Sequence, residues 1–153
     1  MKKIISIILI ALILVSFVSA NRILYKEKDT ASKTYAIWAK KILDKTPPFN
    51  EKKWVITQYR HQIYKGDFLV EVKDLNKEYG NYYGLAYFPN STNGGRIFIN
   101  PNSFDVVDQR FLLLHELGHA YSLDHSNDGS MMDHNGGDAK YKGYQVNKIR
   151  SYL

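Results

Sequence analysis

The chain has 153 residues, with 21 Lys and Arg against 15 Asp and Glu, no cysteine, and a formal net charge of +6. The absence of cysteine excludes disulfide bonds and thiolate chemistry, so a bound metal ion would have to be held by His, Asp or Glu. The basic residues are scattered among acidic ones and form no clustered stripe, which argues against nucleic acid as a partner.

The first twenty residues have the pattern of a secretory signal peptide. A positive start precedes an apolar run that ends at Val18, and the small residues Ser19 and Ala20 suit cleavage. We therefore expect export to the cell envelope or the medium, with residues 21–153 forming one domain, since they are too few for two. The alternative is a membrane anchor made by uncleaved residues 4–20, a run somewhat short of the roughly 20 residues that a spanning helix needs.

Helix and strand patterns follow one another after residue 20. A helix is predicted at 31–44, because Asp29 or Thr30 can cap it and Pro47-Pro48 stops it. Alternating apolar residues and turn-rich connections predict strands at 54–59, 67–73, 82–88 and 96–100. A helix at 105–122, apolar nearly all round, should lie in the core, and a last helix should run from near Asp138 to the end. This order predicts an α+β fold, in which a small mixed twisted sheet packs on an N-terminal and a central helix.

The second half of the central helix carries the sequence HELGH. His115 and His119 lie one helical turn apart and project from the same face, so both imidazoles can reach one ion. Glu116 stands beside the first of them, where it can take a proton from a water molecule that the metal activates. A catalytic zinc ion takes three protein ligands and leaves the fourth position to water, so one more ligand is needed.

The third ligand must come from the residues after the helix. No glutamate follows Glu116, which argues against the zinc enzymes that recruit a glutamate from a later helix. The remaining candidates are Asp124, His125, Asp128, Asp133, His134 and Asp138. A continuous helix, at about 1.5 Å per residue, would carry His125 roughly 15 Å from His115. His125 can therefore join the site only if the helix ends near Ser122 and the chain doubles back.

The stretch HELGHAYSLDH, from His115 to His125, resembles the extended zinc motif HExxHxxGxxH of the metzincin metalloproteases. It matches the histidine spacings and departs at Ser122, where the family has a glycine that turns the chain. A left-handed serine costs of order 1 to 2 kcal/mol, which is small against zinc affinities of roughly 10 kcal/mol, so we expect a strained turn and a retained ligand. The resemblance implies His115, His119 and His125 as zinc ligands and Glu116 as the catalytic base.

Further residues resemble the matrixin branch of that family. A methionine turn follows the third histidine there, and Met132, or alternatively Met131, stands at this position. His134, two residues after Met132, is a candidate helper for the transition state, with an ordinary surface histidine as the simpler alternative. The strand ahead of the zinc helix lines the substrate cleft in matrixins. The resemblance implies that here this edge is formed by Leu85, Ala86, Tyr87 and Phe88.

We therefore expect an exported, monomeric zinc endopeptidase with a metzincin-like fold, a C-terminal helix after the methionine turn, and Zn2+ as cofactor. Its partners would be protein or peptide substrates, and it would not insert stably in a membrane once the signal is cleaved. The alternative is a catalytically silent zinc-binding module that binds extended peptides or the cell surface. The intact Glu116 argues against that alternative.

Overall fold

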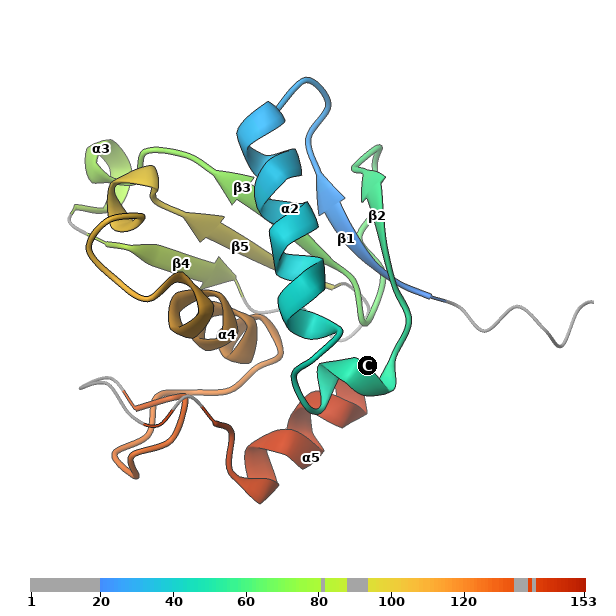
Figure 1. The fold of residues 1–153 in the computed structure, drawn as a ribbon, viewed down its shortest axis with the longest axis vertical. Helices are drawn as coiled ribbons and strands as arrows, with labels where there is room; N and C mark the ends of the chain where they lie inside the picture. Colours follow the sequence, from blue (N-terminus) through green and yellow to red (C-terminus); the bar gives the residue numbers. More distant parts are fainter. Residues whose placement is uncertain (1–19, 81, 88–93, 134–137, 139) are drawn as a thin grey trace, which may run out of the picture.

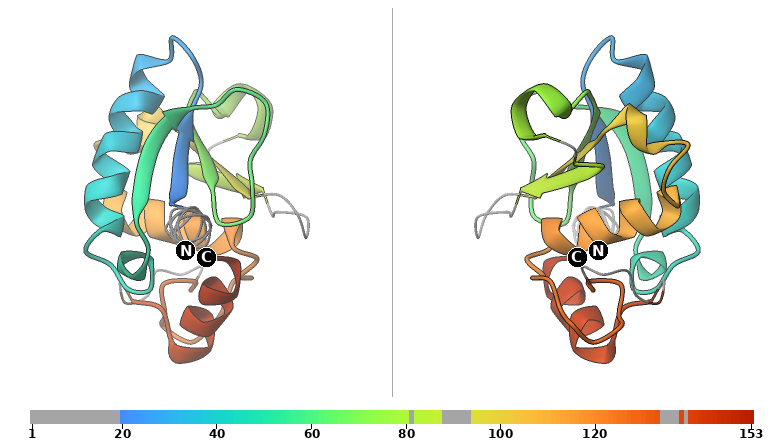
Figure 2. Two further views of the ribbon diagram at one scale, coloured as in Figure 1. Left: turned by 90° about the vertical axis from the view of Figure 1, so that its right-hand side faces the viewer. Right: turned by 90° about the vertical axis from the view of Figure 1, so that its left-hand side faces the viewer.

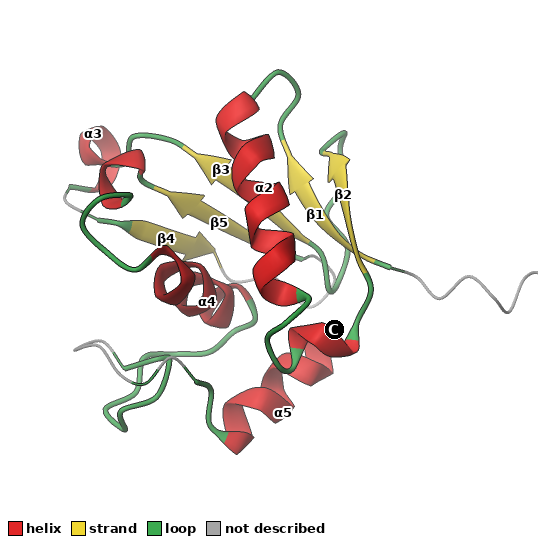
Figure 3. Ribbon diagram, in the orientation of Figure 1, coloured by secondary structure: helices red, strands yellow, loops and turns green. Residues whose placement is uncertain are grey.

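The computed structural model describes residues 20–80, 82–87, 94–133, 138 and 140–153. Within them, a mostly parallel five-stranded sheet has the order β2-β1-β3-β5-β4 and is accompanied by four helices (Figures 1 and 3). The strands are β1 (Asn21–Tyr25), β2 (Trp54–Gln58), β3 (Phe68–Val72), β4 (Gly84–Tyr87) and β5 (Gly95–Ile99). The helices are α2 (Thr30–Leu43), α3 (Asn76–Tyr79), α4 (Gln109–Ala120) and α5 (Gly143–Tyr152). The predicted mixture of helices and sheet is thus confirmed at the level of the α+β class.

Helices α2 and α4 cover one face of the sheet, and α5 lies beyond its end (Figures 1 and 2). Helix α2 packs on β1, β2 and β3, whereas α4 packs on β4 and β5. The core between these layers is apolar, and Phe68, Val70 and Ile97 from the sheet are fully buried in it together with Leu113 and Leu117 from α4. This packing fixes the central helix beside β4, which in the described residues is an edge strand paired antiparallel with β5.

Strand β1 is an element that the sequence pattern does not predict. Ile23 and Leu24 are both buried, but they belong to two different apolar clusters, on opposite faces of the sheet. A strand buried on both faces lacks the alternation of polar and apolar residues that marks a half-exposed strand. The short helix α3 was not predicted either.

Two predicted helix starts are wrong. Helix α4 begins at Gln109 and not at residue 105, because the Asp108 side chain accepts hydrogen bonds from the backbone N–H groups of Arg110 at 2.8 Å and Phe111 at 3.3 Å. The last helix begins at Gly143 and not near Asp138, after Lys142, whose backbone N–H donates to the Gln145 side chain at 2.8 Å. Gly143 therefore opens this helix instead of interrupting it.

The expectations for the N-terminus concern residues 1–20, of which the structure describes only the last. In the described part of the chain, no helix is long and apolar enough to cross a membrane.

Candidate metal centre

The chain reverses at the end of α4 in the way that the histidine spacing requires. Ser122 has a left-handed backbone with φ 64°, its N–H donates to the His119 carbonyl at 2.8 Å, and the N–H of Leu123 donates to the Gly118 carbonyl at 2.9 Å. These two bonds form the Schellman pattern, which usually places glycine in the left-handed position. The serine thus makes the turn that a glycine would make, and the chain after it runs back along the helix.

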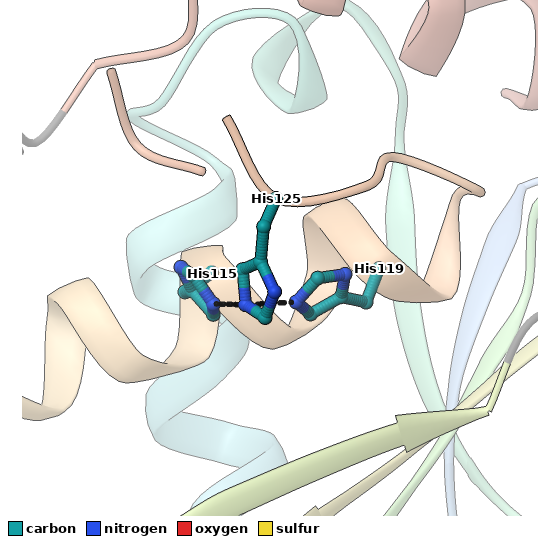
Figure 4. Close-up of side chains that lie close together, drawn as sticks. All are labelled: His115, His119 and His125. Atoms are coloured by element: carbon teal, nitrogen blue, oxygen red, sulfur yellow. Dashed lines mark hydrogen bonds between the residues drawn. The ribbon is translucent and has the colours of Figure 1, made fainter. Parts of the chain in front are cut away.

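The reversal brings His125 onto the two histidines of α4 (Figure 4). Nε2 of His125 lies 3.2 Å from Nε2 of His115 and 3.1 Å from Nε2 of His119. Each of the three side chains offers a nitrogen within 4.8 Å of the others, so the cluster can hold one metal ion. Three nitrogens bound tetrahedrally at about 2.0 to 2.1 Å from zinc would lie roughly 3.3 Å apart, close to the observed spacing.

Hydrogen bonds on the far side of two rings fix which nitrogen faces the centre. Nδ1 of His115 donates to the Met131 carbonyl at 2.9 Å, and Nδ1 of His119 donates to the Leu123 carbonyl at 2.7 Å, since a carbonyl can only accept. Both neutral rings therefore turn an Nε2 lone pair toward His125. The Nε2 atoms of all three rings thus face one another at a spacing that a single metal cation can bridge. The donor set fits a metal ion such as zinc.

Burial favours the neutral form of two of these histidines. It lowers the pKa of His119 to about 4 and lowers that of His115 as well, and the backbone hydrogen bonds to Leu123 and Met131 offset only part of the effect. Neutral imidazole is the form that binds a metal. At neutral pH His115 and His119 are therefore ready to coordinate a metal ion without first losing protons.

Glu116 lies between α4 and β4 and lines the same cleft as the three histidines. Only 6% of its surface is exposed, and burial raises the pKa of its carboxyl to about 8. Its carboxylate fills the space beside Gly84: a methyl group there would lie 2.7 Å from Oε1 of Glu116. A cation in the histidine cluster would favour the ionised form and lower this pKa. The side chain is thus a buried acid–base group at the edge of the cleft.

Met131 and Met132 are both fully buried, and each makes a different contact with α4. The Met131 carbonyl accepts the hydrogen bond from His115, and the Met132 sulfur packs against Gly118 of α4. The segment predicted as a methionine turn therefore lies directly against α4, the helix that carries His115 and His119, and both methionines contact that helix.

A cleft of about 530 Å³ runs between α4 and β4 past the three histidines. Glu116 lines it together with Leu85 and Ala86 of the predicted substrate edge. Exposed Tyr82 and Tyr83 line it too, although no role was predicted for either residue. The cleft thus brings together the three imidazole nitrogens, a buried carboxyl and a strand edge that has no neighbouring strand among the described residues.

The other predicted residues take different places. Asp124 and Asp133 line the cleft outside the histidine cluster, whereas Asp128 forms an ion pair with Lys142. Tyr87 lies at the exposed end of β4 and is hydrogen-bonded to Tyr79. Phe88 and His134 fall outside the described residues, so their predicted roles stay predictions. No model of a known protein family matches this chain, and no curated protein sequence matches it either.

Proposed function

We propose that the protein is a zinc-dependent endopeptidase. The observation that carries the proposal is the convergence of three histidine nitrogens beside a buried glutamate, in a cleft bordered by a strand edge. His115, His119 and His125 would hold the ion. A zinc ion bound by three histidines acts as a Lewis acid, which makes water acidic enough to ionise near neutral pH and polarises a carbonyl group.

Glu116 would move the proton in this reaction. Its carboxylate accepts a proton from the attacking water and delivers it to the leaving amine nitrogen, as general base and then general acid. Burial raises the pKa of Glu116 to about 8, and a strongly perturbed acid that lines a cleft is a candidate for a catalytic group. The buried position also keeps competing water away from the carboxylate.

The edge strand β4 would hold the substrate. In the described structure its outer side has no neighbouring strand, so its backbone groups are open to an extended peptide that adds to the sheet. Leu85 and Ala86 lie along the cleft opposite the helix that carries His115. Main-chain pairing at this edge would present a peptide bond to the metal centre.

The test is a Glu116→Gln variant, which keeps the shape of the side chain and removes its basicity. Purified residues 21–153 should bind stoichiometric zinc and cleave an unfolded protein, and the variant should keep the zinc and lose roughly 10²- to 10⁴-fold in rate. Glu27→Gln, at an exposed site far from the cleft in sequence and outside its lining, is the matched control and should retain the wild-type rate. Undiminished cleavage by Glu116→Gln would refute the proposed mechanism.

A further inference from the structure

We propose that Gly84 positions Glu116: the absence of a side chain at the start of β4 is what lets the carboxylate lie in the wall of the cleft. This role rests on the proposed peptidase function. Gly84 lies within the predicted strand 82–88 but was given no role of its own, and it lies on the strand that packs against α4.

The evidence is the space that Glu116 occupies. A methyl group on Gly84 would lie 2.7 Å from Oε1, 2.8 Å from Cγ and 2.9 Å from Cδ of Glu116. Non-bonded carbon atoms normally lie about 3.5 to 4.0 Å apart, so any side chain at position 84 would have to displace the carboxylate or separate the strand from the helix.

Backbone conformation does not explain the glycine. The left-handed glycines of the described chain are Gly66, Gly80 and Gly129, and Gly84 is an ordinary strand residue. Most other residues could adopt this backbone. The requirement at position 84 is therefore one of space, and the group that uses the space is the carboxylate of Glu116.

The strand and the helix are both held in place, so the Glu116 side chain is the part that would yield. Gly84 pairs with Ile99, which is fully buried, and the N–H of Asn100 donates to the Tyr83 carbonyl at 2.9 Å. On the helix, the neighbour Leu117 is fully buried in the core. A side chain at position 84 would rotate the carboxylate away while the histidines stay in place.

The first experiment measures thermal stability of the metal-free protein in a double-mutant cycle. Gly84→Ala should lower the melting temperature of the wild type, but not that of Glu116→Ala, where the truncated side chain leaves room for the methyl group. The proposal is overturned if Gly84→Ala lowers the melting temperature equally in the wild type and in Glu116→Ala, or lowers it in neither. If Gly84→Ala alone fails to fold, the proposal requires the double variant Gly84→Ala/Glu116→Ala to fold. A double variant that also fails to fold overturns the proposal.

The second experiment measures kinetics with zinc bound. A misplacement of about 1 Å can lower a rate on the order of 10²-fold, so Gly84→Ala should lower kcat by roughly that factor, with KM and zinc content nearly unchanged. Gly143→Ala, where a methyl group meets nothing within 4 Å, is the matched control and should leave kcat unchanged. A wild-type kcat in Gly84→Ala overturns the positioning role. An inactive wild type would refute the peptidase function, while the stability cycle still reports the steric coupling.

Discussion

The sulfur of Met132 occupies the space beside Gly118 in which any side chain on that residue would lie. Both residues are buried, and Gly118 stands directly before the second histidine of the HELGH sequence. The glycine is therefore explained by packing: it lets the segment after the third histidine lie close against the helix that carries the other two.

Gly118→Ala should destabilise the protein. Alanine favours a helix over glycine by roughly 1 kcal/mol, but overpacking against the Met132 sulfur costs about 1 to 3 kcal/mol, so the free energy of unfolding should fall by up to about 2 kcal/mol. Urea denaturation measures the change. Gly143→Ala, at the open first turn of α5, is the matched control and should be neutral or stabilising. A similar increase in the free energy of unfolding for Gly118→Ala and Gly143→Ala would contradict the close packing of Met132 on Gly118.

Ser122→Gly should stabilise the protein. The left-handed backbone of Ser122, with φ 64°, is unfavourable for a residue with a Cβ by about 1 to 2 kcal/mol, and the greater freedom of glycine in the unfolded chain offsets roughly 0.5 to 1 kcal/mol of this. A net gain of up to about 1 kcal/mol is expected in the same denaturation assay. Ser122→Ala keeps the Cβ and should show no such gain. A loss of stability in Ser122→Gly would mean that the serine hydroxyl matters more than the backbone strain.

Zinc should stabilise the folded protein through the histidine cluster. A ligand at 100 times its Kd adds about 2.7 kcal/mol to the free energy of unfolding, so a chelator should lower the Tm of the zinc-loaded protein by several degrees. His125→Ala should abolish most of this difference because it removes one of the three nitrogens. His61→Ala, an exposed histidine outside the cluster, should preserve it. A chelator effect that survives in His125→Ala would place the ion elsewhere.

Asp128 should make stability depend on acid pH. Hydrogen bonds from the Ser130 and Ser126 side chains hold the pKa of Asp128 below its ordinary value of 3.8. A depressed folded-state pKa contributes stability that is present above the unfolded value and lost as the pH falls below it. Asp128→Asn should therefore be less stable than the wild type at pH 6, and the gap should narrow below about pH 4 in unfolding titrations. If the stability difference between Asp128→Asn and the wild type stays constant down to pH 2, the stabilisation comes from the shape of the Asp128 side chain and not from its charge.

The histidine cluster could be predicted from the sequence because its geometry is mostly local. His115 and His119 are one turn apart on any helix, and the argument that His125 needs a reversal at Ser122 follows from helix dimensions. The reversal is present, with Ser122 in the left-handed backbone that the missing glycine had made doubtful.

Contacts between distant segments could not be predicted in this way. The space that Gly84 leaves for Glu116 depends on how β4 lies against α4, and no spacing in the sequence encodes that distance. Strand β1 was missed for a related reason, because burial of Ile23 and Leu24 on opposite faces removes the periodic signal. Local patterns specify single helices and strands. The position of the Glu116 carboxyl depends instead on how β4 packs on α4.

The exposed edge of β4 also bears on how the molecules behave at high concentration. Open backbone groups that suit a peptide suit a strand from a second molecule equally well, so such an edge carries a risk of edge-to-edge association. In the described part of the chain the strand spans four residues, Gly84 to Tyr87, and Pro89, which has no N–H to donate, follows shortly in the sequence. Under the proposed function, such a short edge would receive one extended substrate chain while offering too few hydrogen bonds to build a stack of sheets.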